Sequence, residues 1–218
     1  MADPSLKRRS ALADVPLVSL PDRVAVTAAP DACRFLFRGG VDAVNACGKG
    51  LGFALPIQAC LSSGKGSTSA LWLGPDEWLI IGPDADTASL ESTLKKSLQS
   101  HAHSLVDVSH RQVGLELTGT DAAQLLNSCC LLDLDIAAFP VGMCVRTVFG
   151  KAEIVLLRTD RNSFHLEVWN SFASYVGALL QEAAYGLSAN YSMANPTGGG
   201  LLMTPRSEPH RIFSGELK

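Results

Sequence analysis

Three polar residues that stand close together in the sequence, Asp107, Ser109 and His110, have the types found in hydrolytic triads. The surrounding run alternates apolar and polar residues, as a half-buried strand does. Since side chains alternate between the two faces of a strand, we expect Asp107 and Ser109 on one face and His110 on the other. A triad requires the three groups to converge, and the sequence has no G-x-S-x-G nucleophile elbow. The pattern therefore does not indicate a hydrolase.

Two short glycine-rich runs, at residues 48–52 and 64–66, have some likeness to phosphate-binding loops. A dinucleotide-binding fingerprint needs G-x-G-x-x-G between a strand and the start of a helix, but the first run lies at the end of an expected helix. The second run lacks the earlier glycine and the Ser or Thr directly after Lys65 that a P-loop requires. We interpret both runs as turn glycines and expect no FAD or NAD site of the usual kind.

Metal-ligating residue types are present but are not spaced as ligands. His101 and His103 could share a metal from one strand face, yet they have no acidic or cysteine companion at a ligand spacing. Solvation at a helix terminus, where a cation meets the negative end of the dipole, explains them more simply. The six cysteines lie mostly among apolar neighbours, which predicts buried reduced thiols: Cys33, Cys47, Cys60, Cys129, Cys130 and Cys144. We expect no catalytic, cofactor-binding or metal-binding residue in this chain.

The remaining candidates are aromatic and basic side chains in or near two expected hairpins. Trp and Arg are favoured at protein interfaces because each covers apolar area while offering directional hydrogen bonds. Burial in the core explains the tryptophans equally well, because hairpin positions that face helices are commonly buried. The candidate interface residues are Trp72, Trp78, Arg146, Arg158 and Trp169.

The elements that must position these residues fall into two halves with the same order. Each half is expected to contain a strand, a helix, a hairpin and a closing helix with apolar residues on one face. In the first half these elements are expected at residues 33–38, 41–49, 70–73 with 77–82, and 86–100. In the second half they are expected at residues 113–118, 121–129, 154–158 with 164–169, and 170–185. A strand over residues 104–109 is expected to join the two halves.

This order of elements predicts an α+β fold with mainly antiparallel sheets, in which each half approximates a ferredoxin-like β-α-β-β-α-β repeat. We expect one two-repeat domain over residues 31–186. Residues 1–30 are expected to form a partly ordered extension with a short strand at 23–27. The Ser-, Asn-, Pro- and Gly-rich residues 187–218 are expected to form a tail that is either disordered or ordered by a partner.

Composition limits the class of the protein. The 218 residues are 47% hydrophobic and 18% charged, with a formal net charge of -3. This balance gives no basic footprint for nucleic acid. Apolar runs are too short for a membrane span, and the first residues lack a signal-peptide core. We therefore expect a cytoplasmic globular protein without nucleic-acid or membrane partners.

Several separated motifs, taken in order, resemble one known family. Asp107-Val108-Ser109-His110, before a strand that ends in Gly119-Thr120-Asp121-Ala122-Ala123, is similar to the folate-binding aminomethyltransferase (glycine-cleavage T-protein) superfamily. Within it, the chain resembles the gamma subunits of heterotetrameric sarcosine oxidases over roughly residues 33–185. This narrower resemblance depends on Leu71-Trp72-Leu73-Gly74-Pro75-Asp76-Glu77-Trp78-Leu79, Arg146-Thr147, Gly150-Lys151-Ala152-Glu153 and Glu167-Val168-Trp169-Asn170-Ser171-Phe172.

The resemblance implies a non-catalytic scaffold subunit with the fold of an aminomethyltransferase domain. Complexes of this kind oxidatively demethylate sarcosine to glycine, with hydrogen peroxide and formaldehyde or, when tetrahydrofolate is present, 5,10-methylenetetrahydrofolate. The resemblance assigns FAD, FMN, NAD and tetrahydrofolate to the alpha and beta subunits and zinc to the delta subunit. The expected partners are the alpha, beta and delta subunits, and the aminomethyltransferase-like region of the alpha subunit is favoured among them.

One departure from the wider superfamily bears on activity. In folate-dependent aminomethyltransferases the corresponding hairpin resembles Gly-x-x-x-Asp-Asp and supplies the aspartate needed for methylene transfer, whereas this chain has Gly150-Lys151-Ala152-Glu153-Ile154-Val155. The missing pair argues against an autonomous aminomethyltransferase. Two alternatives stay open: the equivalent subunit of an N-methylglutamate-type dehydrogenase, and a free-standing folate-binding one-carbon protein.

Overall fold

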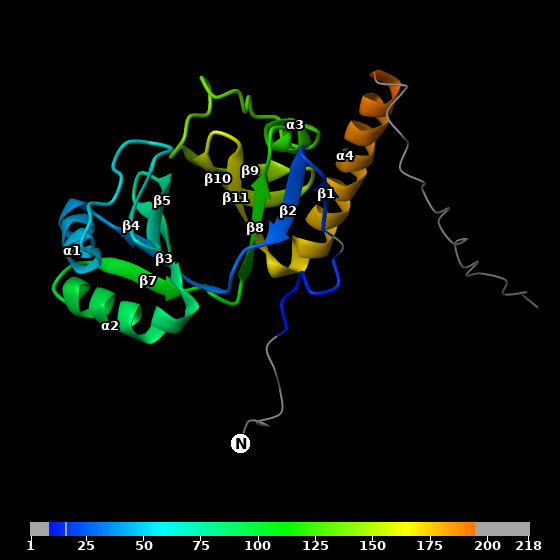
Figure 1. Ribbon diagram of the computed structural model, residues 1–218. Coiled ribbons are helices and arrows are strands. Elements are labelled where there is room, and N and C mark those ends of the chain that lie inside the picture. Colours follow the sequence, from blue (N-terminus) through cyan, green and yellow to red (C-terminus); the bar gives the residue numbers. More distant parts are fainter. Residues whose placement is uncertain (1–8, 16, 195–218) are drawn as a thin grey trace, which may run out of the picture.

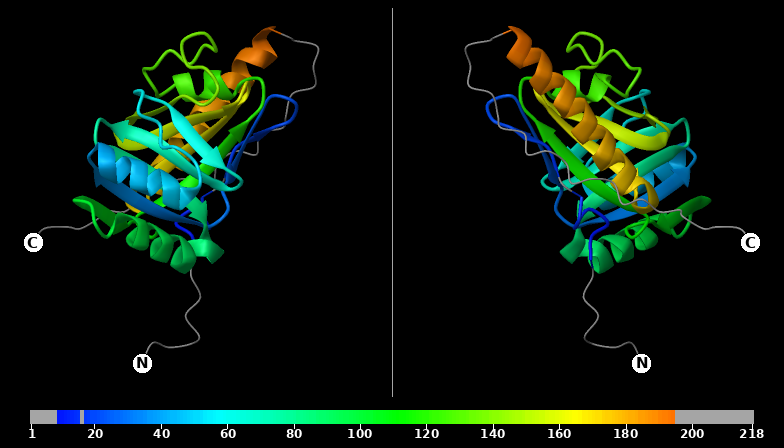
Figure 2. Two further views of the ribbon diagram at one scale, coloured as in Figure 1. Left: turned by 90° about the vertical axis from the view of Figure 1, so that its left-hand side faces the viewer. Right: turned by 90° about the vertical axis from the view of Figure 1, so that its right-hand side faces the viewer.

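A computed structural model of the chain describes residues 9–15 and 17–194. Two antiparallel sheets face each other, and helices cover the outer face of each sheet (Figure 1). Helices α1 (Val41–Leu51) and α2 (Thr87–Leu98) cover one sheet, and α3 (Ala122–Asn127) and α4 (Ala173–Ala194) cover the other. The layers therefore run helix, sheet, sheet, helix, with the long α4 across one outer face (Figure 2).

The first half of the described chain forms a five-stranded sheet in which every neighbouring pair is antiparallel. Its strand order is β4-β5-β6-β3-β7. A short 3-10 helix, η1 (Asp84–Asp86), precedes α2. The strands are β3 (Ala32–Gly39), β4 (Ser62–Lys65), β5 (Thr68–Gly74), β6 (Glu77–Pro83) and β7 (His103–Asp107).

The second sheet has six antiparallel strands in the order β1-β2-β8-β11-β10-β9. The 3-10 helix η2 (Asn170–Phe172) leads into α4. The strands are β1 (Ser19–Leu20), β2 (Val24–Ala28), β8 (Gln112–Thr118), β9 (Cys144–Phe149), β10 (Ala152–Asp160) and β11 (Ser163–Trp169).

Strict alternation along the strands explains why both faces of each sheet are buried. In β3, Cys33, Phe35 and Phe37 pack toward α1 and α2, so the period of two turns Arg34 and Leu36 toward the other sheet. In β11, the apolar residues Phe164, Leu166 and Val168 pack toward α3 and α4 in the same way. The polar residues between them consequently face the seam between the sheets.

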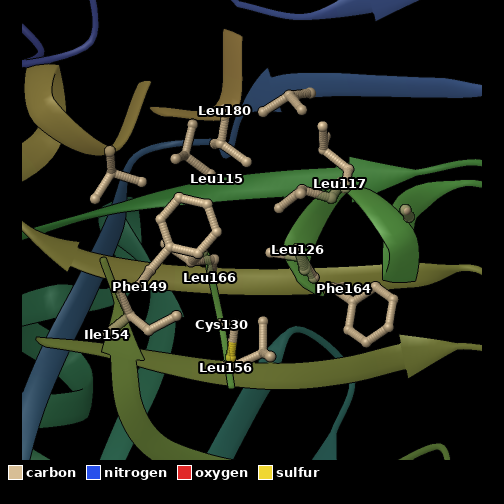
Figure 3. Packing of buried hydrophobic residues seen from close by; sticks show 14 of the residues in the cluster. Leu115, Leu117, Leu126, Cys130, Phe149, Ile154, Leu156, Phe164, Leu166 and Leu180 are labelled. Atoms are coloured by element: carbon tan, nitrogen blue, oxygen red, sulfur yellow. The ribbon is translucent and has the colours of Figure 1, made fainter. Parts of the chain in front are cut away.

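The larger core lies between the six-stranded sheet and α4. Leu115, Phe149, Leu166 and Leu180 converge there (Figure 3), and each is at most 1% exposed. Full burial of one such side chain stabilises the fold by about 1.5–3 kcal/mol relative to leaving it exposed. A smaller apolar cluster fills the seam between the sheets and includes Leu71, Leu79, Val108, Cys144 and Val155. The two sheets therefore share a core in addition to the core that each shares with its helices.

The structure confirms the α+β class, the antiparallel sheets and the principal strands and helices of both halves. The prediction that a strand over residues 104–109 joins the two halves was wrong. The strand exists as β7, but it pairs with β3 at the edge of the five-stranded sheet. Strands β4 and β9 were not expected. The β4 sequence Ser-Ser-Gly-Lys has no apolar residue to signal a strand. Strand β4 is defined by its pairing with β5.

Residues 19–28, which the expected boundaries assign to an N-terminal extension, supply two strands of the six-stranded sheet. Strand β2 pairs with β8 beside it (Figure 1), and Val24 and Val26 are each 2% exposed. Helix α4 likewise continues past residue 186 to Ala194. Among the described residues, none of the helices is long and apolar enough to span a bilayer.

Candidate functional site

An open cleft of about 810 Å³ lies where the two sheets meet. This volume falls within the range of small-molecule sites, about 300–1,000 Å³. Its walls are formed by β4, by the starts of β3, β5 and β11, by the ends of β6 and β10, and by the middle of β8. The residues that bear on its chemistry are Asp31, Ser69, Ile81, Glu116, Leu157 and His165.

A chain of four charged side chains crosses the seam at one wall of this cleft. His165 lies between two carboxylates: its Nδ1 is 2.6 Å from Glu116 Oε1 and its Nε2 is 2.8 Å from Glu167 Oε1. The guanidinium of Arg34 on the facing sheet donates to both oxygens of Glu167, from Nε at 2.6 Å and from Nη2 at 2.9 Å. We call Arg34, Glu167, His165 and Glu116 the seam network.

The seam network is deeply buried at one end and reaches the cleft at the other. The side chains of Arg34 and Glu167 are 3% and 0% exposed, whereas those of His165 and Glu116 are 13% and 34% exposed. One further bond holds the Arg34 side chain: its Nη1 donates to the carbonyl of Ala32 at 2.9 Å. An unpaired charge is costly to bury, so removal of one member would destabilise the fold by leaving its buried neighbour without a partner.

The network shifts the pKa values of His165 and Glu167. Burial opposes the charged form of His165, but hydrogen bonds and attraction from Glu116 and Glu167 outweigh burial and raise the pKa of His165 to about 9. Burial also opposes the charge of Glu167, and its bonds to His165 and Arg34 outweigh that effect and lower the pKa of Glu167. At neutral pH His165 is therefore protonated and Glu167 is ionised.

The raised pKa of His165 predicts a specific pH dependence. The folded-state pKa of His165, about 9, lies above the ordinary value of 6.5. The stability that protonated His165 contributes to the fold is therefore complete below about pH 6.5 and is lost as the pH rises through about 9. An NMR titration of the His165 ring should show the transition near pH 9. Substitution Glu116→Gln should lower the His165 pKa, and a wild-type ring that titrates near pH 6.5 would contradict the assignment.

Asp107 and Ser109 lie next to the backbone of Arg34. The Ser109 hydroxyl donates to Asp107 Oδ1 at 2.5 Å and accepts the backbone N–H of Arg34 at 2.9 Å. The hydrogen bond from Ser109 lowers the pKa of Asp107. Strand β7 ends at Asp107 and Ser109 lies in the turn that follows, so the two residues meet through a turn and not through strand alternation. Ser109 then fixes the strand that carries Arg34.

Two of the expected interface residues are buried within the chain, which corrects their assignment. Trp78 is 2% exposed, stacks at 5.7 Å against Phe37 and donates its indole N–H to the carbonyl of Pro56 at 2.7 Å. Arg158 is also 2% exposed and lies 4.5 Å from the centre of the Phe164 ring. Neither side chain offers surface to a partner.

Arg158 has a structural role instead. Its Nη1 donates to the carbonyl of Arg161 at 2.7 Å and its Nη2 donates to the carbonyl of Leu134. Burial lowers the pKa of Arg158. The side chain therefore ties the loop before β9 to the turn between β10 and β11.

The other three expected interface residues have different surroundings. Trp72 is partly buried against the core of the five-stranded sheet. Arg146 forms an ion pair with Glu77 across the seam. Trp169 is 40% exposed at the end of β11, with the Arg111 guanidinium 5.4 Å from its ring centre. Of the three, Trp169 presents the largest aromatic surface.

Sequence reasoning did not single out Arg34, Glu116, His165 or Glu167. The available signal was a charged residue at alternate positions of otherwise apolar strands, such as Glu167 between Leu166 and Val168. In the part of the chain that the structure describes, no group of His, Cys, Asp and Glu has the arrangement of a metal site. The contacts within the seam network are hydrogen bonds between charged side chains.

Comparison with known proteins identifies relatives. Residues 40–186 match the family described as "Sarcosine oxidase, gamma subunit family". The chain is 32% identical over 148 residues to a sarcosine oxidase subunit gamma from Corynebacterium sp. (strain P-1), covering 65% of this chain and 72% of that one. It is 33% identical over 117 residues to the subunit gamma from Arthrobacter sp., covering 53% and 57%.

Solved structures agree with these relatives. A chain of the heterotetrameric sarcosine oxidase from Corynebacterium sp. U-96 in complex with pyrrole 2-carboxylate superposes with a TM-score of 0.76 and 26% identity, over 82% of this chain and 95% of that chain. The glycine cleavage system aminomethyltransferase T from Bartonella henselae shares the fold, with a TM-score of 0.59 and 12% identity over 72% of this chain and 45% of that one. The chain belongs to the sarcosine oxidase gamma subunit family.

Proposed function

We propose that this chain is the gamma subunit of a heterotetrameric sarcosine oxidase and acts in that complex as a scaffold. The observation that carries the proposal is the superposition on 95% of a chain from such a complex, with a TM-score of 0.76. Family membership over residues 40–186 supports it. The complex would oxidatively demethylate sarcosine to glycine, with hydrogen peroxide and formaldehyde or 5,10-methylenetetrahydrofolate. A cytoplasmic location is part of the same proposal.

The hairpin sequence supports a non-catalytic role. Glu153 replaces the expected pair of aspartates at residues 150–155 and is exposed on β10. We propose that FAD, FMN, NAD, tetrahydrofolate and zinc are held by the alpha, beta and delta subunits. The Glu153→Gln variant of the assembled complex should accordingly keep its turnover within a few fold.

The two halves are proposed to be ferredoxin-like repeats. In the first half, the order β5-β6-β3-β7 with α1 and α2 on one face fits this repeat, with β4 as an added edge strand. In the second half, β10-β11-β8 has the same relative order, and β2 from the N-terminal part of the chain takes the position that β7 has in the first half. The shared fold with an aminomethyltransferase supports this reading.

The partner surface is proposed to lie at the end of the seam opposite the cleft. Three apolar side chains of β7, β9 and β11 are exposed: Val106, Val148 and Trp169 are 49%, 46% and 40% exposed. The guanidinium of Arg111 over Trp169 adds a hydrogen-bonding rim. This combination suits a protein partner, and the alpha subunit is the one we favour.

Native mass spectrometry of the chain isolated from its own cells tests the subunit assignment. We expect a complex with a large flavin-bearing chain, a second flavoprotein chain and a small zinc-binding chain. A lone chain that binds tetrahydrofolate would instead support a free-standing one-carbon protein. A complex that oxidises N-methylglutamate but not sarcosine would support the related dehydrogenase.

Substitution Trp169→Ala tests the proposed partner surface. Truncation of an aromatic residue at the centre of an interface costs about 2 kcal/mol or more, which is about a 30-fold loss of affinity. We expect this loss in the titration of the variant against the remaining subunits, while its thermal unfolding stays close to that of the wild type. The matched control is Val41→Ala, at an exposed position on the opposite helical layer. Equal assembly by the Trp169 variant and the wild type would exclude this surface.

A further inference from the structure

We propose that the cleft between the two sheets binds a small organic cation, a protonated amine with an apolar body, and that the carboxylate of Glu116 anchors it. This proposal goes beyond the scaffold role. The position of Glu116 is the starting point: it lines the cleft, and its side chain is 34% exposed although it belongs to a largely buried network. Glu116 is therefore the member of the seam network with the most open face toward a ligand.

The network holds this carboxylate in a fixed position. Glu116 Oε1 is 2.6 Å from His165 Nδ1, and His165 is fixed in turn by Glu167, at 2.8 Å. Arg34 on the facing sheet holds Glu167 with two bonds. A charged group that is already oriented needs little reorganisation when it binds a ligand, which favours affinity.

The remaining charges of the cleft favour a cation over an anion. Both ring nitrogens of His165 face carboxylates. Arg158 also lines the cleft, but its two terminal nitrogens donate to the backbone carbonyls of Arg161 and Leu134. Lys65 lies between two lining glycines, but its ammonium is next to Gly52, the residue that follows α1. Asp31 also lines the cleft.

The rest of the lining suits an organic ligand. Pro30, Ile81, Pro83, Val141 and Leu157 supply apolar contact surface around the carboxylate. The described residues contain no cluster of ligands for a metal ion, and a hard metal cation prefers six or more oxygen ligands. An ammonium group requires only one carboxylate and neighbouring hydrogen-bond acceptors. A protonated amine with an apolar body fits both the carboxylate and the apolar lining of the cleft.

Backbone amide NMR of the full chain tests the proposal with three probes of one ring size. Piperidine is a cation at neutral pH, cyclohexanol is neutral and cyclohexanecarboxylate is an anion. Piperidine should shift the amides of Ser69, Gly82 and Gly142 around the cleft and saturate at millimolar concentration or below. Cyclohexanol and cyclohexanecarboxylate should bind at least about tenfold more weakly, because only the cation pairs with Glu116.

Two variants distinguish binding of piperidine at Glu116 from a general attraction of the cation to a negatively charged protein. Glu116→Gln should weaken piperidine binding about tenfold or more, while Glu153→Gln, an exposed carboxylate outside the cleft lining, should leave binding unchanged. Equal loss in both variants, equal binding of all three probes, or absence of shifts at the cleft amides would each overturn the proposal. If Glu116→Gln does not fold, the comparison of the three probes on the wild-type chain decides the matter alone.

Discussion

Substitution Arg34→Met is expected to lower the free energy of unfolding by about 3–5 kcal/mol, because it leaves a buried carboxylate without its partner. Arg34 and Glu167 have side chains that are 3% and 0% exposed and share two hydrogen bonds. The loss reaches further than one pair, since Glu167 also holds His165. Urea unfolding, followed by circular dichroism, measures the change.

The same strand supplies a matched control. Arg38 pairs with Asp76 at 2.8 Å, but the two side chains are 54% and 55% exposed. Exposed pairs contribute about 0–1 kcal/mol, so Arg38→Met should change little. A double variant, Arg34→Met with Glu167→Leu, should recover much of the loss because no buried charge remains unpaired. If Arg34→Met is no more destabilising than Arg38→Met, the seam network does not stabilise this fold.

Substitution Trp78→Ala is expected to destabilise the chain by about 3–5 kcal/mol, as large-to-small changes in a core do. Trp78 packs against Phe37 between the five-stranded sheet and its helices, and the backbone carbonyl of Pro56 accepts its indole N–H. The truncation therefore creates a cavity and removes the hydrogen bond to the partly buried Pro56 carbonyl. Thermal and urea unfolding of the isolated chain provide the measurement.

Trp169→Ala is the control with the same change of side chain. Trp169 is 40% exposed, so its truncation should cost the isolated chain less than about 1 kcal/mol. The sequence predicts both tryptophans as interface candidates. The two variants should show that Trp78 stabilises the fold and that Trp169 does not. Similar unfolding free energies for the two variants would contradict the burial of Trp78.

The sequence by itself determined the principal strands and helices and the α+β class. Alternation over residues 113–118 and 164–169, and helical spacing over residues 170–185, are local patterns that need no knowledge of the partner elements. They correspond to β8, β11 and the start of α4. The absence of phosphate-loop spacing could also be read directly, because such motifs are contiguous in the chain.

Only the tertiary structure decided which strands are neighbours and which polar residues meet. Strand β2 completes the six-stranded sheet from the N-terminal part of the chain, and β7 lies at an edge of the other sheet, although both are short strands with similar local signals. Arg34 and Glu167 are 133 residues apart in the chain. Their pairing depends on the packing of two sheets, a long-range event that no local pattern encodes, and burial then makes the pairing obligatory.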